Sequence, residues 1–177
     1  MPTTGVTVVA LMCLLAFLGG GCGGGDGERL VEVCLVEYDH WTKDDPPPPD
    51  MDNLDGTYAL HSFDIDIWID GIPQMPISSD AFSSFSGSMI INSGTISESI
   101  TVDGETSSFT GTFAVSSSNA YYGTLHITDI SGTYDFTCAI GPVTICDPDC
   151  QEFVFLTLAN EQICFQVPES ELDGMQP

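Results

Sequence analysis

Cysteine is the residue type in this sequence with the widest choice of chemistry. Four of the seven cysteines stand between positions 138 and 164, where they could form a four-thiolate zinc site: Cys138, Cys146, Cys150 and Cys164. In an exported chain, which the N-terminus indicates, oxidation to disulfides is the favoured outcome for such thiols. The sequence therefore predicts bridges, with Cys146 and Cys150 tying one loop, and it predicts neither a metal site nor a cofactor.

The N-terminal segment has the pattern of an export signal. Residues 1–21 carry no charged side chain, and Val6 to Leu18 is a run of 13 mainly apolar residues. Such a run is too short to span a bilayer but fits the core of a signal peptide. The small residues Gly19 to Gly21 then lead into Cys22, and Leu18-Gly19-Gly20-Gly21-Cys22 resembles the lipobox of bacterial lipoproteins.

The lipobox resemblance implies that Cys22 is lipidated and becomes the first residue of the mature protein. Because Gly rather than Asp follows Cys22, the resemblance also implies sorting to the outer membrane of the cell envelope. The alternative is ordinary cleavage after Gly21, which would give a secreted protein.

The number of cysteines bears on the same question. After loss of Cys13 with the signal and lipidation of Cys22, five candidates for disulfides remain: Cys34, Cys138, Cys146, Cys150 and Cys164. Because five is odd, one of them stays free or pairs with another molecule. Otherwise Cys22 is not lipidated and three bridges form.

The charge balance excludes several classes of partner. The chain has 26 acidic and two basic residues, a formal charge of −24, and no Lys or Arg from Leu54 onward. Such a surface repels phosphate backbones and anionic headgroups, so we predict no nucleic-acid binding and membrane contact through a lipid anchor only. A basic protein partner is allowed but not identified, and the acidity is more simply a solubility device.

Apolar residues on every second position organise the region from Ile96 to Cys138. This alternation is typical of antiparallel strands with one buried face, and it recurs in these residues: Ile96, Ile100, Val102, Phe109, Phe113, Val115, Tyr121, Leu125, Ile127, Tyr134 and Phe136. The whole pattern predicts eight strands, near 56–70, 86–92, 95–102, 105–115, 121–130, 133–140, 152–159 and 162–168. A meander of this length removes its edges by closing on itself, so we predict an all-β fold with an eight-stranded antiparallel up-and-down barrel.

Two-residue loops give this prediction an internal check. A two-residue hairpin keeps the same face buried on both sides, and the apolar residues satisfy this at Ser93-Gly94, Asp103-Gly104, Ser131-Gly132 and Asn160-Glu161. At the last of these, we predict a hairpin that pairs residues 154–158 with residues 163–167.

The predicted domain organisation follows from these elements. Residues 1–21 are the signal, residues 22–53 a tether with a short element of uncertain type and a Pro-rich linker, residues 54–168 the barrel, and residues 169–177 a flexible acidic tail. Gly71 to Phe85 is predicted to be a loop or lid. We further hypothesise that the element at Leu30 to Trp41 covers the apolar outer side of the last hairpin and brings Cys34 near Cys164.

Glu98 stands out because it occupies an inward position between Ile96 and Ile100. If it is buried, loss of solvation raises the pKa of its carboxyl group, which is a mark of ligand anchors and catalytic acids. The alternatives are that it lines a wet barrel mouth, or that a bulge turns it outward.

A second resemblance concerns the domain as a whole. Gly56-Thr57-Tyr58 at the start of the first predicted strand, the Gly/Ser/Thr-rich meander and Thr128-Asp129-Ile130 are similar to features of bacterial lipocalin-like domains, over Leu54 to Val167. This resemblance implies a barrel that binds one small apolar molecule. The candidate ligand-binding residues are Glu98, Tyr121, Tyr134 and Phe136.

No catalytic arrangement is visible in the sequence. His61 and His126 are isolated, and there is no nucleophile elbow, metalloprotease helix or phosphate loop. We therefore predict a non-enzymatic protein. The competing class is a packed structural or protein-interaction module, and a cavity of roughly 300 Å³ or more would favour ligand binding over a filled interior.

Overall fold

The computed structural model describes residues 29–43, 53–118, 121–129, 132–146, 148–159 and 162–172. The predicted signal, the lipidation candidate Cys22, the prolines of the linker and the end of the acidic tail lie outside these ranges. Among the described residues, no helix has the length and apolar character needed to cross a membrane.

Nearly all described elements are strands. They are, in order, β1 (Leu30–Lys43), β2 (Gly56–Ile69), β3 (Ile72–Pro73), β4 (Ile77–Ser78), the 3-10 turn η1 (Ser79–Ala81), β5 (Phe85–Asn92), β6 (Thr95–Val102), β7 (Glu105–Ser118), β8 (Tyr122–Asp129), β9 (Gly132–Cys146), β10 (Cys150–Ala159), β11 (Ile163–Pro168) and the helical turn α2 (Glu169–Leu172).

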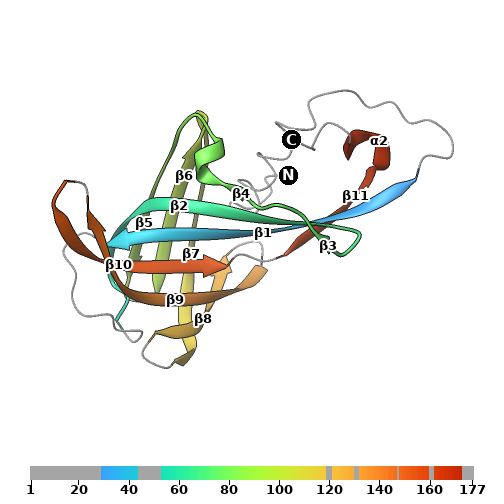
Figure 1. The fold of residues 1–177 in the computed structure, drawn as a ribbon. Coiled ribbons are helices and arrows are strands. Elements are labelled where there is room, and N and C mark those ends of the chain that lie inside the picture. The colour runs from blue at the N-terminus through green and yellow to red at the C-terminus, as the bar shows by residue number, and fades with distance from the viewer. Residues whose placement is uncertain are drawn as a thin grey trace.

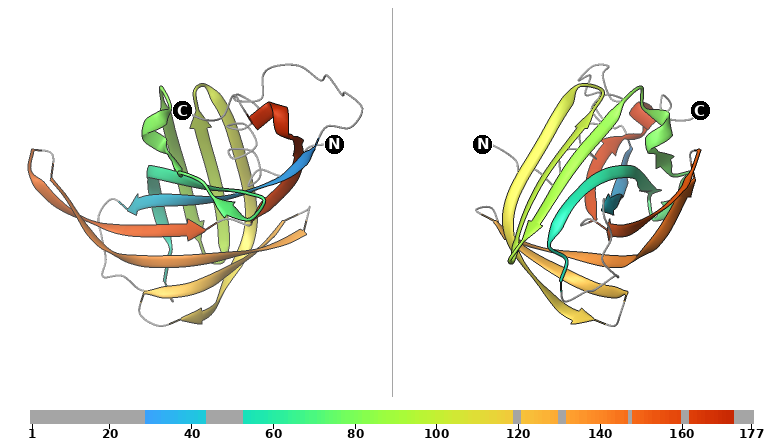
Figure 2. Two further views of the ribbon diagram at one scale, coloured as in Figure 1. Left: turned by 45° about the vertical axis from the view of Figure 1, so that its right-hand side comes forward. Right: turned by 90° about the vertical axis from the view of Figure 1, so that its left-hand side faces the viewer.

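Eight of these strands close into a barrel, as the sequence predicts. The barrel strands pair antiparallel with their neighbours in the order β2, β5, β6, β7, β8, β9 and β10. β1 closes the barrel because it pairs with both β2 and β10 (Figure 1). The long strands curve strongly around one another, so that the β9–β10 hairpin and the β1–β11 ribbon extend from the barrel on opposite sides (Figure 2).

The closing strand is not the predicted one. The element of uncertain type is β1, so the barrel begins at Leu30, and the predicted boundary at Leu54 is wrong. The inward row of β1 starts with apolar residues but continues with Glu37 and Asp39 before Trp41. Because two carboxyl groups replace apolar side chains there, the alternation that identifies a strand is broken.

The predicted hairpin at Asn160-Glu161 is also wrong. Both β10 and β11 run antiparallel to β1, with Tyr38 opposite Ala159 and Leu35 opposite Ile163. The partner residues advance by four positions while β1 advances by three, so β11 continues along the same edge of β1 with its register shifted by one residue relative to β10. Asn160 and Glu161, the predicted turn residues, lie outside the described ranges. A register shift of one residue moves the buried face by one position and leaves the same parity as a two-residue hairpin, so the parity check could not separate them.

The predicted hairpins at Ser93-Gly94 and Asp103-Gly104 are confirmed. Ser93 and Gly94, and likewise Asp103 and Gly104, have positive φ angles at both turn positions, as tight hairpin turns require. β8 and β9 also pair antiparallel, as predicted, but Asp129 lies opposite Gly132, so Gly132 is the first residue of β9 and not a turn residue as predicted. Ser131 lies outside the described ranges.

The interior is packed with large side chains. Those buried most completely are Trp41, Tyr58, Phe63, Ile65, Met89, Ile91, Ile96, Leu125, Ile127, Phe136, Leu156 and Leu158. The predicted loop or lid contains β3, β4 and η1, and its Phe82 packs on Phe63 with 5.3 Å between ring centroids. The lid therefore contributes to the core at one end of the barrel.

The disulfides follow the predicted pairs. Cys34 and Cys164 lie opposite each other on β1 and β11 and are bridged, and Cys146 is bridged to Cys150 at the turn between β9 and β10. The hypothesis that placed Cys34 near Cys164 is confirmed, although strand pairing rather than packing on an outer face brings them together. Cys138 is a buried free thiol, and a four-thiolate site is therefore excluded.

Candidate ligand site inside the barrel

Three carboxyl groups point into the barrel. Glu37 and Asp39 are alternate residues of β1 and are only 3% and 1% exposed. Glu98 on β6 occupies the inward row between the buried Ile96 and Ile100. The inward position predicted for Glu98 is confirmed, whereas Glu37 and Asp39 were missed. Continuing the alternation of Val31, Val33 and Leu35 through to Trp41 would have placed both acids inside.

These acids are surrounded by apolar residues. The residues opposite Asp39 are Phe63 on β2 and Leu158 on β10, and those opposite Glu98 are Met89 on β5 and Phe109 on β7. In such surroundings the ionised form of a carboxyl group is disfavoured. Burial, and secondly the charge of Asp39, raise the pKa of Glu98 well above its usual range.

The basic side chains of the chain all lie elsewhere. Arg29 forms ion pairs with Asp70 at 2.9 Å and with Glu169 at 3.0 Å. Lys43 donates a hydrogen bond from Nζ to the backbone oxygen of Asp55 at 2.6 Å. The sequence contains no other Lys or Arg.

The three histidines are also outside the barrel. His40 lies 3.2 Å from Asp64 and stacks on Phe155, His61 is exposed, and His126 pairs with Asp135 on the outer face of the sheet. No Lys, Arg or His side chain therefore balances the interior carboxyl groups.

Trp41 adds a buried donor to this interior. It is 0% exposed and lies opposite the inward Leu156, and its Nε1 donates no hydrogen bond to any described residue. One oxygen each of Glu37 and Asp39 is likewise buried without a hydrogen bond, although both residues make other contacts. An unsatisfied buried polar atom typically costs about 1–3 kcal/mol, so an indole N–H in this state is unusual.

The predicted ligand-binding residues divide into two groups. Phe136 is 1% exposed in the interior, and Tyr134, two residues earlier on β9, is partly buried against the same core. Tyr121 is 49% exposed and precedes β8. The structure thus brings Glu98, Tyr134 and Phe136 into the barrel wall and leaves Tyr121 at the surface.

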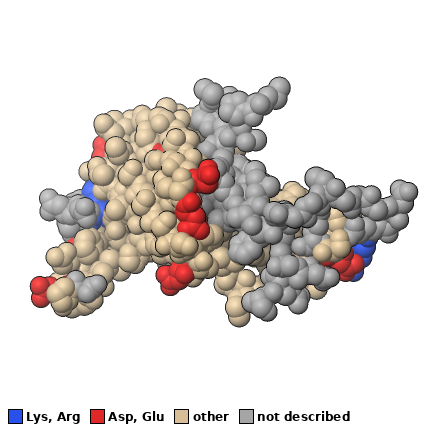
Figure 3. All heavy atoms as spheres, turned by 90° about the horizontal axis from the view of Figure 1, so that it is seen from above, with Lys and Arg blue, Asp and Glu red and all other residues tan. Residues whose placement is uncertain are grey.

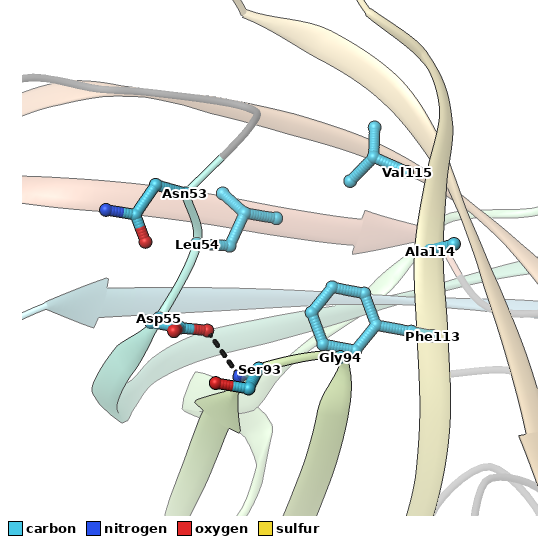
Figure 4. A pocket seen from close by; sticks show the side chains of 8 residues that line it. All are labelled: Asn53, Leu54, Asp55, Ser93, Gly94, Phe113, Ala114 and Val115. Carbon is cyan, nitrogen blue, oxygen red and sulfur yellow. Dashed lines mark hydrogen bonds between the residues drawn. The ribbon is translucent and has the colours of Figure 1, made fainter.

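A separate pocket of about 310 Å³ lies at the barrel end opposite the lid. The side chains of Leu54, Phe113 and Val115 point toward it and that of Ala114 points away, while the carboxylate of Asp55 accepts a hydrogen bond from the Ser93 backbone N–H at 2.8 Å (Figure 4). None of the three interior acids lines this pocket, and it is open to solvent.

The described residues offer no metal site. Among them, no three His, Cys, Asp or Glu side chains stand together in a way that could hold a metal ion. Glu37, Asp39 and Glu98 therefore do not form a cage of oxygen ligands around a single point.

Comparison with family models, with curated proteins and with solved structures finds no match to this chain.

Proposed function

We propose that this chain is an exported, non-enzymatic, lipocalin-like protein that binds one small molecule inside its barrel. The observation that carries the proposal is the set of three inward carboxyl groups with no basic side chain to balance them. A barrel with only a structural task would be more stable with aliphatic residues at these positions, because buried charged groups are costly unless paired.

The lid end of the interior has aromatic side chains that are only partly buried. Phe85, Phe109 and Tyr134 belong to the inward rows and pack on the core, yet they are only partly buried. A small molecule entering from this end would meet aromatic rings first and the carboxyl groups beyond them. Mostly apolar linings with a few placed polar groups are typical of small-molecule sites.

The acidic side chains on one outer face bear on whether a basic protein could bind there. On the face shown in Figure 3, the acidic side chains lie scattered and most of the described surface is uncharged. The described residues of that face form no continuous acidic patch that would suit a basic protein.

We also propose that the protein is lipidated at Cys22 and displayed on the cell envelope, with the outer membrane as its destination. Two bridges and one buried thiol use the five cysteines of the described residues and leave Cys22 for the lipid. The bridges support an oxidising compartment. Intact mass measurement of the mature protein tests this proposal, because a secreted form would lack the mass of the acyl chains.

The second candidate is a packed structural or interaction module. The many fully buried side chains of the core favour it, since they fill much of the space that a ligand would need. The two candidates differ in whether the interior accepts a molecule at all.

Titration with the neutral fluorescent probe N-phenyl-1-naphthylamine distinguishes them. Ser107 is buried in an inward row, and the next residue, Ser108, is exposed. We expect probe fluorescence to rise on binding, Ser107→Phe to weaken binding at least about tenfold, and Ser108→Phe to leave it unchanged. Absence of binding by the wild type, together with native mass spectra that show only the polypeptide, would favour the packed module.

A further inference from the structure

We infer that the ligand is a small organic cation, a protonated amine held between Asp39 and Glu98. This inference rests on the proposed function and names the chemical class of the ligand for that site. The same carboxyl groups would repel an anionic ligand, and a purely apolar ligand would leave their charge without compensation.

The first argument is the charge balance of the interior. Asp39 and Glu98 belong to the inward rows of two strands that are not neighbours, β1 and β6, so both carboxyl groups face the same interior. Both basic residues and all three histidines are placed outside the barrel. A bound ammonium group would supply the positive charge that the side chains of the interior lack, and it donates up to three hydrogen bonds to carboxylate oxygens.

The second argument is the buried indole of Trp41. Its Nε1 donor is without a hydrogen-bond partner among the described residues, and it shares the inward row of β1 with Asp39, two positions away. Alternate residues of a strand are about 6.5–7 Å apart, so one ligand can reach both side chains. A ligand with a hydrogen-bond acceptor a few atoms from its ammonium group would satisfy the indole N–H and the carboxylates together.

The third argument separates an organic cation from a metal ion. Calcium takes six to eight oxygen ligands around one point, and the described residues contain no such cluster. The interior instead provides aromatic surface at Phe63 and Trp41. Aromatic faces attract organic cations and also pack against their apolar part.

The test uses three compounds with one skeleton and different charges. They are 2-phenoxyethylamine, its neutral counterpart 2-phenoxyethanol and the anion phenoxyacetate, each with an ether oxygen as acceptor. The protein is the full mature chain with Trp68→Phe, which leaves Trp41 as its only tryptophan. We expect the amine to change Trp41 fluorescence with at least tenfold higher affinity than the alcohol, and the anion to have no effect.

Substitutions of the two interior acids test where the amine binds. Asp39→Asn and Glu98→Gln should each reduce the preference for the amine over the alcohol to less than threefold, whereas Glu152→Gln, at an exposed position of β10, should keep it. Equal affinity for amine and alcohol would overturn the inference and leave the proposed function standing. An amine preference that survives both interior variants, or is lost in Glu152→Gln, would also overturn it. If neither these compounds nor N-phenyl-1-naphthylamine bind, the proposed function itself fails.

A calorimetric measurement adds a readout that a structural role for the acids would not give. An ammonium group binds the ionised form of a carboxyl group, so the proton held by Glu98 leaves when the amine binds. The residues opposite Asp39 and Glu98 on β2, β5, β7 and β10 have no titratable side chains. Glu37, on the inward row of β1 with Asp39, is the third acid that faces this interior. We expect the binding enthalpy of the amine to change with the ionisation enthalpy of the buffer, because the buffer takes up the released proton. A binding enthalpy that is the same in all buffers would contradict the inference.

Discussion

Asp39 on β1 and Glu98 on β6 both point into the barrel, where burial and, secondly, the charge of Asp39 raise the pKa of Glu98. The two strands are not neighbours in the sheet, so only closure of the barrel brings these carboxyl groups together. Since burial is the larger cause of the shift, the folded protein holds a proton on Glu98 at pH values where the unfolded chain has released it.

The first prediction concerns pH and stability. An unfolded Glu has a pKa of about 4.3, and the folded value for Glu98 is higher. Between these values the folded state binds more protons, so the free energy of unfolding falls as pH rises, by at most about 1.4 kcal/mol per pH unit for one proton. Below the unfolded pKa the contribution of Glu98 is fully present, and above its folded pKa it is lost.

Thermal unfolding of the ligand-free protein between pH 4 and pH 8 measures this dependence. We expect Glu98→Gln to flatten it and to raise stability at pH 8 by about 1 kcal/mol or more. Glu152→Gln, exposed on the outer surface, is the control and should keep the wild-type slope. Equal slopes for wild type and Glu98→Gln would contradict the raised pKa.

The second prediction compares the two disulfides. The Cys34–Cys164 bridge closes a loop with a sequence separation of 130, and the Cys146–Cys150 bridge one of 4. Chain entropy gives about 5 kcal/mol for the long loop and about 2 kcal/mol for the short one. Urea unfolding should show that paired Cys→Ser substitutions at Cys34 and Cys164 destabilise the barrel more than those at Cys146 and Cys150. The opposite order would show that loop length does not dominate here.

The third prediction tests where the domain begins. A chain of residues 29–172 contains the closing strand β1, and one of residues 53–172 does not. The shorter chain leaves long edges on β2 and β10 unpaired and lacks the buried Trp41, so we expect it to aggregate or remain unfolded. Circular dichroism and amide NMR dispersion provide the measurement. A cooperative transition of similar midpoint for both chains would restore the boundary at Leu54.

The success and failure of the sequence predictions have a common physical origin. The strands from β5 to β9 were predictable because their inward rows are largely apolar and tight turns such as Asp103-Gly104 separate them. β1 was predicted only as an element of uncertain type because two acids, Glu37 and Asp39, interrupt the apolar alternation of its inward row. The one-residue register shift between β10 and β11 was mistaken for a hairpin because both leave the same parity of buried residues, and only the pairing with β1 distinguishes them.

The fourth prediction concerns the remaining thiol. Cys138 faces the interior of the barrel beside β8, and burial raises its pKa to about 11, against a smaller opposing effect of a hydrogen bond with the Gly123 backbone. The thiolate is the reactive form, and at pH 8 only about one part in a thousand would be ionised. In mature protein with Cys22→Ser, we expect Ellman's reagent to find no reactive thiol while the barrel is folded and one after unfolding in guanidinium chloride. Fast reaction of the folded protein would mean that Cys138 is open to solvent or that one of the two bridges is not formed, and peptide mapping of the labelled residue would decide which.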